Sequence, residues 1–391
     1  MSSGRVYLDY NATAPPDPEV IARIRPYMEA DFGNPSSLHR EGQRARAAIN
    51  GARAGLARIL HCQENEILFT SGATEALNHV FLGFLQQPAG HLITTQIEHL
   101  AVLEPCRFLE KSGWSVTYLP VDGDGLVSPA AVRQAVRPDT RLISCMHANN
   151  ETGTVQPVRE IGEIARAAGI PFLTDAVQSF GKISVDLAAW NASFAVFSAH
   201  KIGGLKGTGL LYVRRDRDLT SLIRGGHQER GGRGGTENVA GIVAMAEAAR
   251  LAEARRAGEA ARLKTLRDTL EAGILKQLTG ARVTAGGAER LPNTLHVVWE
   301  HLDSEKLLMG FDLAGIAISN GSACDSGSVE PSHVVAALGL PDSYRKGAVR
   351  FSLGRGTTAE EIDRALTETI RIVRHLQKER VHAGPVKHAG N

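Results

Sequence analysis

Short apolar runs alternate with helical patterns through the central part of the chain. The apolar runs cover residues 66–70, 91–95, 141–146, 171–174, 194–198 and 209–213. Helical patterns lie between several of them, as at residues 158–168, where apolar residues recur every three or four positions. This alternation predicts an α/β fold with a large, mostly parallel, doubly wound sheet. A Gly-rich turn separates the last two runs, so these two can pair antiparallel.

The length of the chain and one long helical pattern predict two domains. A chain of 391 residues exceeds the usual size of one hydrophobic core. Residues 238–277 form a single Ala-, Arg- and Glu-rich helical pattern, long enough to connect domains. We expect a large domain at 15–258, and a smaller α+β domain formed by 1–14 and 259–376. Residues 377–391 are expected to be a flexible polar tail.

Composition and charge exclude several classes of function. Lys and Arg number 44 against 42 Asp and Glu, a net charge of +2, which does not favour direct binding of nucleic acid or anionic membranes. No apolar stretch approaches the roughly 20 residues of a membrane span. The first residues lack a basic segment followed by an apolar one, so we expect no signal peptide and a cytoplasmic location.

The four cysteines differ in their surroundings. Cys62, Cys106 and Cys145 lie near apolar segments and are expected to be small core residues. Their spacing does not match a zinc site, and a reducing cytoplasm disfavours disulfides. Cys324 instead lies among Ser and Gly residues that have little side chain with which to pack. We therefore expect a mobile loop at about 318–332, carrying a thiol that has a use.

Polar residues follow most of the predicted strands, and open α/β sheets bind ligands beyond the carboxyl ends of their strands. After the first run come Ser71, Gly72, Ala73 and Thr74, and then a helix expected to begin at Glu75. Small residues that open a helix expose N–H groups to a phosphate. The residues that follow the other runs include His99, Asn149, Asp175, Gln178, His200 and Lys201.

A lysine at the end of a buried strand, near a phosphate cradle and a buried aspartate, is what pyridoxal 5′-phosphate (PLP) requires. Lys201 would form the Schiff base with the cofactor aldehyde, and Asp175 would keep the pyridine nitrogen protonated. The ring of His99 could lie on the pyridine face. Rival phosphate motifs fail, because residues 203–208 lack the order of a P-loop and residues 231–235 do not match G-x-G-x-x-G.

Segments along nearly the whole chain, from about residue 6 to 374, resemble one family. They include YLDYNATAPPDPEV, FGNPSSLHREGQRAR, FTSGATEALN, TTQIEHLAVLEP, MHANNETGTVQP, TDAVQSFGKI, FSAHKIGGLKGTGLLYV, QERGGRGGTENVAG, SNGSACDSGSVEPSHVVAALG and VRFSLGRGTT. In this order they are similar to the NifS/IscS-type cysteine desulfurases, which are fold-type I PLP enzymes of the class V aminotransferase family.

The resemblance implies a role for each matching residue. Lys201 carries PLP, Asp175 pairs with the pyridinium nitrogen, and His99 stacks on the ring. Arg350 receives the substrate carboxylate through a bidentate pair. Gln178 is implied at the phenolic oxygen of the cofactor, and Asn149 beside the ring and the substrate. The residues implied at the phosphate are Ala73, Thr74, Ser198, His200 and Thr236, the last from a second subunit.

The resemblance also implies the reaction. Cys324 attacks the sulfur of L-cysteine, becomes a persulfide and leaves L-alanine, and a homodimer then passes the sulfur to an acceptor protein. That acceptor serves iron–sulfur cluster assembly, tRNA thiolation or DNA sulfur modification; the sequence leaves the three open. Asp325 stands where the family commonly has Ser or Thr, and a carboxylate there disfavours the thiolate unless solvent screens it.

Two other functions stay open at this point. One is a selenocysteine lyase or another class V PLP enzyme, although cleavage of selenocysteine does not need a stored persulfide. The other is a non-catalytic partner protein that keeps the fold as a binding surface. Taken alone, a lysine placed like Lys201 is a solvated charge in most proteins, and an aspartate placed like Asp175 is a helix cap. Together with His99 and Cys324, at these spacings, they favour the desulfurase.

Overall fold

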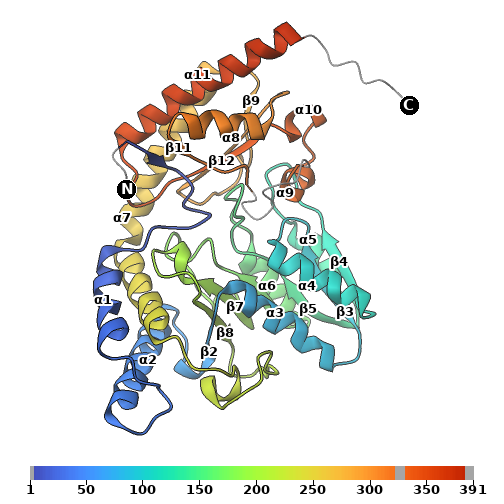
Figure 1. Ribbon diagram of the computed structural model, residues 1–391. Helices are drawn as coiled ribbons and strands as arrows, with labels where there is room; N and C mark the ends of the chain where they lie inside the picture. The colour runs from blue at the N-terminus through green and yellow to red at the C-terminus, as the bar shows by residue number, and fades with distance from the viewer. Residues whose placement is uncertain (1–3, 322–330, 384–391) are drawn as a thin grey trace.

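A seven-stranded sheet forms the centre of the larger part of the molecule (Figure 1), in a computed structural model that describes residues 4–321 and 331–383. In spatial order the strands are β2 (Ile67–Thr70), β8 (Gly209–Val213), β7 (Phe194–Ser198), β6 (Phe172–Asp175), β5 (Thr140–Ser144), β3 (His91–Thr95) and β4 (Ser115–Leu119). Strands β7, β6, β5, β3 and β4 pair parallel, whereas β8 pairs antiparallel with both β7 and β2.

This sheet confirms the predicted α/β class and the antiparallel pair of the last two apolar runs. Every residue of β3 and β7 is buried, as expected for strands covered on both faces. Strand β4 was not predicted. It is an edge strand in which only Leu119 is buried, so its sequence, SVTYL, lacks a continuous apolar run.

Helices cover the two faces of the sheet. They are α2 (Arg40–Ile59), α3 (Ala73–Gly83), α4 (Leu100–Lys111), α5 (Pro129–Ala135) and α6 (Val158–Ala167). Helix α1 (Pro18–Glu29) packs instead against the helix of residues 239–277. Helix α6 illustrates why they form: Val158, Ile161 and Ile164 recur at helical spacing and are buried together against the sheet. Helix α3 begins two residues before the predicted start at Glu75, because the small residues of the preceding segment already belong to its first turn.

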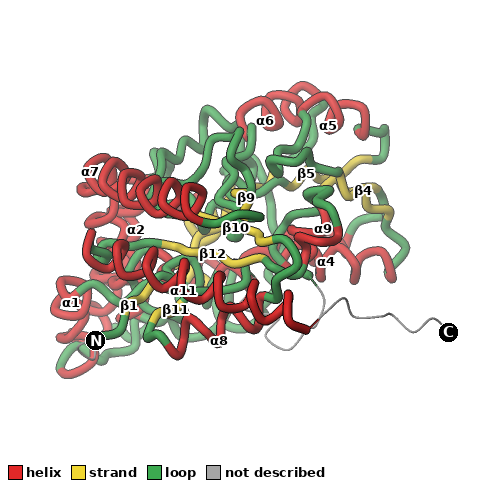
Figure 2. Tube along the Cα trace, turned by 90° about the horizontal axis from the view of Figure 1, so that it is seen from above, coloured by secondary structure: helices red, strands yellow, loops and turns green. Residues whose placement is uncertain are grey.

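The smaller part contains two short sheets. Strand β10 (Thr294–Trp299) pairs antiparallel with β12 (Ala348–Ser352) and β9 (Ala281–Val283), and β1 (Val6–Tyr7) pairs parallel with β11 (Ile316–Ala317). Figure 2 shows α8 and α11 beside β10 and β12. The helices of this part are α8 (Ser304–Leu313), α9 (His333–Ala337), α10 (Asp342–Arg345) and α11 (Ala359–Ala383).

Helix α7 (Val239–Gln277) connects the two parts, as its length predicted (Figure 1). Asn238 caps its first turn by accepting a hydrogen bond from the N–H of Gly241 at 3.0 Å. Near its start, Ile242 is buried in the core under the large sheet, whereas Leu270 near its end is buried in the core of the smaller part. The boundaries at residues 14 and 258 stay a prediction.

The expected flexible tail was placed too early. Helix α11 continues through Ala383, so residues 377–383 are helical, and residues 384–391 lie outside the described residues. Among the helices that the structure describes, none is long and apolar enough to cross a membrane. The described residues also contain no group of three or more His, Cys, Asp or Glu side chains that could hold a metal ion.

Candidate active site

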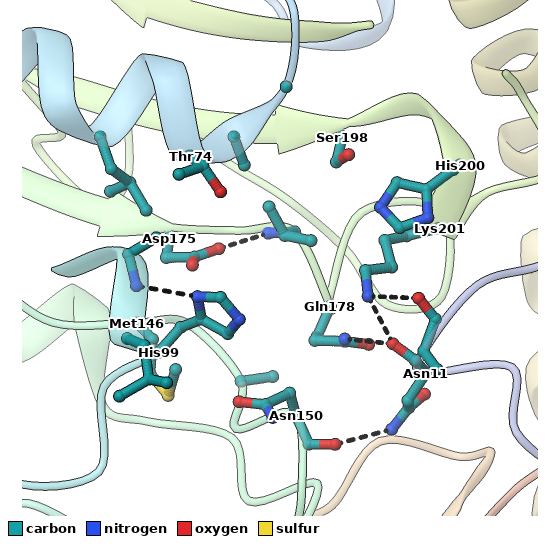
Figure 3. A pocket seen from close by; sticks show the side chains of 18 of the residues that line it. Asn11, Thr74, His99, Met146, Asn150, Asp175, Gln178, Ser198, His200 and Lys201 are labelled. Atoms are coloured by element: carbon teal, nitrogen blue, oxygen red, sulfur yellow. Dashed lines mark hydrogen bonds between the residues drawn. The ribbon is translucent and has the colours of Figure 1, made fainter. Parts of the chain in front are cut away.

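A cavity of about 330 Å³ opens beyond the carboxyl ends of the parallel strands, where the sequence predicts a site (Figure 3). It is lined mostly by segments that directly follow β2, β3, β5, β6 and β7, with additions from the chain before α1 and from β12. The predicted site residues that line it are Ala73, Thr74, His99, Asp175, Gln178, Ser198, His200, Lys201 and Arg350.

Lys201 follows the buried strand β7 in a single 3₁₀ turn, Ala199–Lys201. This turn directs the side chain into the cavity (Figure 3), where the amine donates to two backbone carbonyls. The acceptors are the carbonyl oxygens of Asn11 at 2.6 Å and Ala12 at 2.8 Å. The amine is therefore held at one place in the site by a segment near the N-terminus, about half the chain away in sequence.

Asp175 is the last residue of β6 and is 8% exposed. Its Oδ1 accepts a hydrogen bond from the N–H of Val177 at 2.9 Å. Burial raises the pKa of this carboxyl to about 6, against the opposing effects of that hydrogen bond and of the Lys201 cation. A cationic ligand nitrogen beside it would offset the cost of burial, so this carboxylate suits the protonated nitrogen of a heterocycle.

His99 caps helix α4, and its Nδ1 accepts a hydrogen bond from the N–H of Ala101 at 3.1 Å. The proton of the neutral ring therefore lies on Nε2. Burial, together with the charges of Lys201 and His333 acting in the same direction, lowers its pKa to about 4. At neutral pH His99 is an uncharged ring in the cavity, which suits stacking on an aromatic ligand.

The amino end of helix α3 provides a place for a phosphate. The first N–H groups of a helix have no partner within it, and Ala73 and Thr74 open α3 at the cavity (Figure 3). Ser198 at the end of β7 and His200 after it line the same region. Burial lowers the pKa of His200 to about 4, so we expect hydrogen bonding rather than charge from this ring.

Arg350 comes from β12, at the opposite wall of the cavity, and is fully buried. Its Nη2 donates to Oδ1 of Asp9 at 2.7 Å, and its Nη1 donates to the carbonyls of Asn150 and Gly321, each at 2.8 Å. Its Nε has no hydrogen-bond partner among the described residues. Asp9 and the two carbonyls fix the guanidinium, and a buried donor without a partner suits an anionic ligand.

The scan against family models matches residues 6–365 to the aminotransferase class-V model. The chain belongs to the class-V aminotransferase family. Two curated relatives in it carry the name cysteine desulfurase IscS. The one from Methanosarcina thermophila is 46% identical, over 95% of this chain and 93% of the relative. The one from Dictyoglomus turgidum is 43% identical, over 95% of both chains.

Solved structures give the same family assignment. A protein described as NifS-like is 36% identical and superposes with a TM-score of 0.89, covering 95% of this chain and all of its own. A structure described as SspA in complex with cysteine is 37% identical, with a TM-score of 0.79, over 89% of this chain and 98% of its own. The mixed α/β fold predicted for this family is therefore confirmed.

Two of the predicted site residues do not line this cavity, and a third lies outside the described residues. Asn149 was expected beside the ring, but it is fully buried and its Oδ1 accepts from the N–H groups of Glu151 and Thr152. The neighbouring Asn150 lines the cavity, and a role of Asn149 beside the ring stays a prediction. Thr236, expected from a second subunit, is exposed and does not line the cavity of its own chain. Cys324 lies outside the described residues.

The cavity also contains residues that the sequence did not predict. Asn11 and His333 come from segments far from the central strands, and Glu151 follows Asn150. His333 donates from Nε2 to the carbonyl of Glu98 at 2.8 Å, beside the start of α4. The segment YLDYNATAPP contains Asn11 and matches the family, so the resemblance carried a signal, but it did not reveal which atoms of this segment face the site.

Gly321 is expected to tolerate no side chain. Its φ is +111°, and a Cβ there would lie 2.5 Å from Oε2 of Glu151. Gly321→Ala should therefore displace Glu151 and the carbonyl that holds Arg350, raising KM for the substrate. Gly339→Ala is the matched control, because Gly339 also has a positive φ but has open space around it.

Backbone strain alone should cost the control about 1 kcal/mol, and the clash should cost Gly321→Ala about 1–3 kcal/mol more. Denaturant unfolding and substrate saturation curves measure both effects. Equal losses of stability in the two variants, with KM unchanged, would contradict the predicted clash.

Glu98 is expected to make the protein less stable as the pH rises. It is fully buried behind the cavity, and burial raises its pKa to about 8. Because the folded-state pKa is raised, the protonated form is favoured by folding; its contribution is complete below about pH 4.5 and is lost as the pH rises toward 8.

The isosteric Glu98→Gln stays neutral and keeps an oxygen to accept from Thr95 and the N–H of Met146. Across pH 5 to 8, the wild-type free energy of unfolding should fall relative to that of Glu98→Gln by up to about 1.4 kcal/mol per pH unit. Denaturant unfolding at several pH values measures the difference. Parallel curves for the two proteins would refute a protonated Glu98.

Proposed function

We propose that this protein is a homodimeric, PLP-dependent cysteine desulfurase that moves sulfur from L-cysteine onto Cys324 and releases L-alanine. One observation carries the proposal: an amine, a buried carboxylate and a neutral imidazole meet beside a helix amino end in one cavity of a class-V aminotransferase. These are Lys201, Asp175 and His99. The names of the relatives support cysteine as the substrate.

The residues present fit the cofactor. Lys201 would link to its aldehyde, and Asp175 would pair with its pyridinium nitrogen at the end of β6. The amino end of α3, with Ser198 and His200, would receive its phosphate. When bound, PLP supplies an electron sink that stabilises negative charge developing at the α- and β-carbons of the substrate.

The protein's own groups bind the substrate and move its protons. Arg350, fixed by Asp9, would bind the carboxylate of L-cysteine. The amine of Lys201 is the group best placed to remove the α-proton, because its Nζ is directed into the cavity. With a pKa of about 4, His99 is neutral, so it positions the ring and donates from Nε2.

Cys324 would take the sulfur. Its thiolate attacks the sulfur of the substrate, an S–S bond forms, and the carbon–sulfur bond breaks with its electron pair left on the β-carbon. Protonation of that carbon completes alanine, and Cys324 is left as a persulfide. The described residues on both sides of this segment support the role: Gly321 lines the cavity, and Ser332 donates to Oε1 of Glu151, another residue of its wall.

Exposed apolar side chains support a homodimer. Phe32 is 78% exposed and Leu38 is 90% exposed, in the loop between α1 and α2. Two large apolar side chains this exposed in one loop suit a surface that a protein partner covers. Thr236 is also exposed, as a residue that a second subunit donates must be.

Steady-state assays distinguish the desulfurase from a selenocysteine lyase. The PLP-loaded protein is incubated with L-cysteine and a thiol reductant, and alanine and sulfide are quantified; L-selenocysteine is tested in parallel. Equal amounts of alanine and sulfide from cysteine, lost in Cys324→Ala, support the proposal. Alanine from selenocysteine alone, undiminished in Cys324→Ala, would assign the lyase instead.

A further inference from the structure

A second lysine, Lys182, lies behind the site. It follows Gln178 by four residues, in the turns after β6. Its Nζ lies 2.9 Å from Oε1 of Gln178 and 3.1 Å from Oδ1 of Asn11. Lys182 does not line the main cavity; it lines a separate one of about 140 Å³, which Lys201 also borders.

This contact fixes the orientation of the Gln178 amide. A carboxamide can be rotated by half a turn, and its oxygen and nitrogen are assigned by their partners. A protonated lysine amine can only donate and the carbonyl of Asn11 can only accept, so Oε1 of Gln178 faces Lys182. Nε2, the other polar atom of the amide, donates at 2.9 Å to the carbonyl of Asn11, a residue that lines the cavity (Figure 3).

Asn11 joins this arrangement to Lys201. Its carbonyl accepts from both Gln178 and Lys201, and its Oδ1 accepts from Lys182. Its own Nδ2 donates to Oγ1 of Thr294 at 2.9 Å, and the residue is 1% exposed. The amide, the two amines and the buried asparagine therefore form one rigid network, in which the orientation of Gln178 depends on the donor behind it.

The protonation state of Lys182 does not decide its hydrogen bond to Gln178. Burial lowers the pKa of Lys182 well below its ordinary range, and the cations of Lys201 and Arg350 act in the same direction. Whichever protonation state results, the amine still has a proton to donate to Oε1 of Gln178. The hydrogen bond to the amide therefore does not depend on Lys182 being charged.

We propose that Lys182 is a positioning residue that holds the Gln178 amide with its NH₂ group facing the cofactor's phenolic oxygen. This rests on the proposed function, in which Gln178 meets that oxygen. A donor there takes up part of the negative charge of the oxygen, and so weakens its hold on the proton of the Schiff base at Lys201. Without Lys182 only the carbonyl of Asn11 holds the amide, so the amide rotates more easily and presents its oxygen for part of the time, and this proton is bound more tightly.

The test is a spectroscopic pH titration of the Schiff-base absorbance in full-length, PLP-loaded protein. Lys182→Met should raise the midpoint by about one pH unit, and Gln178→Leu should raise it similarly. In the double variant, Lys182→Met should add nothing to the effect of Gln178→Leu, because it acts through that side chain. Lys182→Arg keeps a donor, has room in the adjoining cavity, and should restore the wild-type midpoint.

An unchanged midpoint in Lys182→Met, or additive shifts in the double variant, would overturn the positioning role. If Lys182→Met does not fold, the test rests on Lys182→Arg. A midpoint shifted in Lys182→Arg as far as in Gln178→Leu would also overturn the positioning role. Titration midpoints are compared only between variants that bind PLP. Failure of the proposed function would show differently, as wild-type protein that binds no PLP or yields no alanine from cysteine.

Discussion

Lys201→Ala is expected to abolish the covalent attachment of PLP and to lower the rate of alanine formation by roughly 10²–10⁴-fold or more. The amine is the group that would link to the cofactor and move the α-proton, and the cavity positions it through the carbonyls of Asn11 and Ala12. The attachment is measured by borohydride reduction followed by mass spectrometry of the intact protein, and the rate by quantifying alanine.

Lys206→Ala is the matched control. Lys206 lines the same cavity but is exposed, so its loss should leave the covalent attachment intact. If the Lys201 variant still gains the reduced cofactor mass, or if the Lys206 variant loses it, then Lys201 is not the attachment site and the arrangement of the cavity must be reinterpreted.

Asp175→Asn is expected to lower the turnover rate by about 10²–10³-fold while leaving the fold intact. The amide replaces a buried carboxylate that would keep the pyridine nitrogen protonated, so the cofactor becomes a weaker electron sink. Asp186→Asn is the control. Asp186 also accepts from a backbone N–H, that of Ala189 at 2.9 Å, but it is exposed and outside the cavity.

The same substitution has a pH signature. With a pKa of about 6 before the cofactor binds, Asp175 is ionised above pH 6 and protonated below it. The affinity for PLP should therefore fall in the wild type, as the pH falls through 6, more steeply than in Asp175→Asn. The cofactor phosphate titrates near pH 6 in both proteins and cancels in the comparison. Identical pH profiles of the PLP dissociation constant would contradict an ionised Asp175 partner.

The predicted site residues that line the cavity are mostly those at the end of a regular strand or shortly after it. Asp175 ends the buried strand β6 and Lys201 follows the buried strand β7 by one turn, and the carboxyl ends of parallel strands necessarily meet at one edge of the sheet. Asn149 and Asn150 lie instead in an irregular turn, where no periodicity says which side chain faces the cavity. The hydrogen bonds of Asn149 to the N–H groups of that turn decide it.

Sequence periodicity also could not predict which distant segments contribute residues to the site. Asn11 reaches Lys201 across the junction of the two parts, a contact between residues about half the chain apart. No prediction from the sequence concerned Lys182, and its proposed role rests on the distances to Gln178 and Asn11. The edge strand β4 was missed for a related reason, since its one buried residue gives no apolar run.

The central claim is tested most directly by locating the sulfur after a single turnover. PLP-loaded protein is mixed with one equivalent of L-cysteine without reductant, alanine is quantified, and the peptides are analysed by mass spectrometry. We predict one alanine per active site and one additional sulfur atom on the peptide that contains Cys324. Burial raises the pKa of Cys62 to about 12 and those of Cys106 and Cys145 above their ordinary range, so these three should stay unmodified. Alanine formed by Cys324→Ser at the wild-type rate, or sulfur found on another cysteine, would contradict the account.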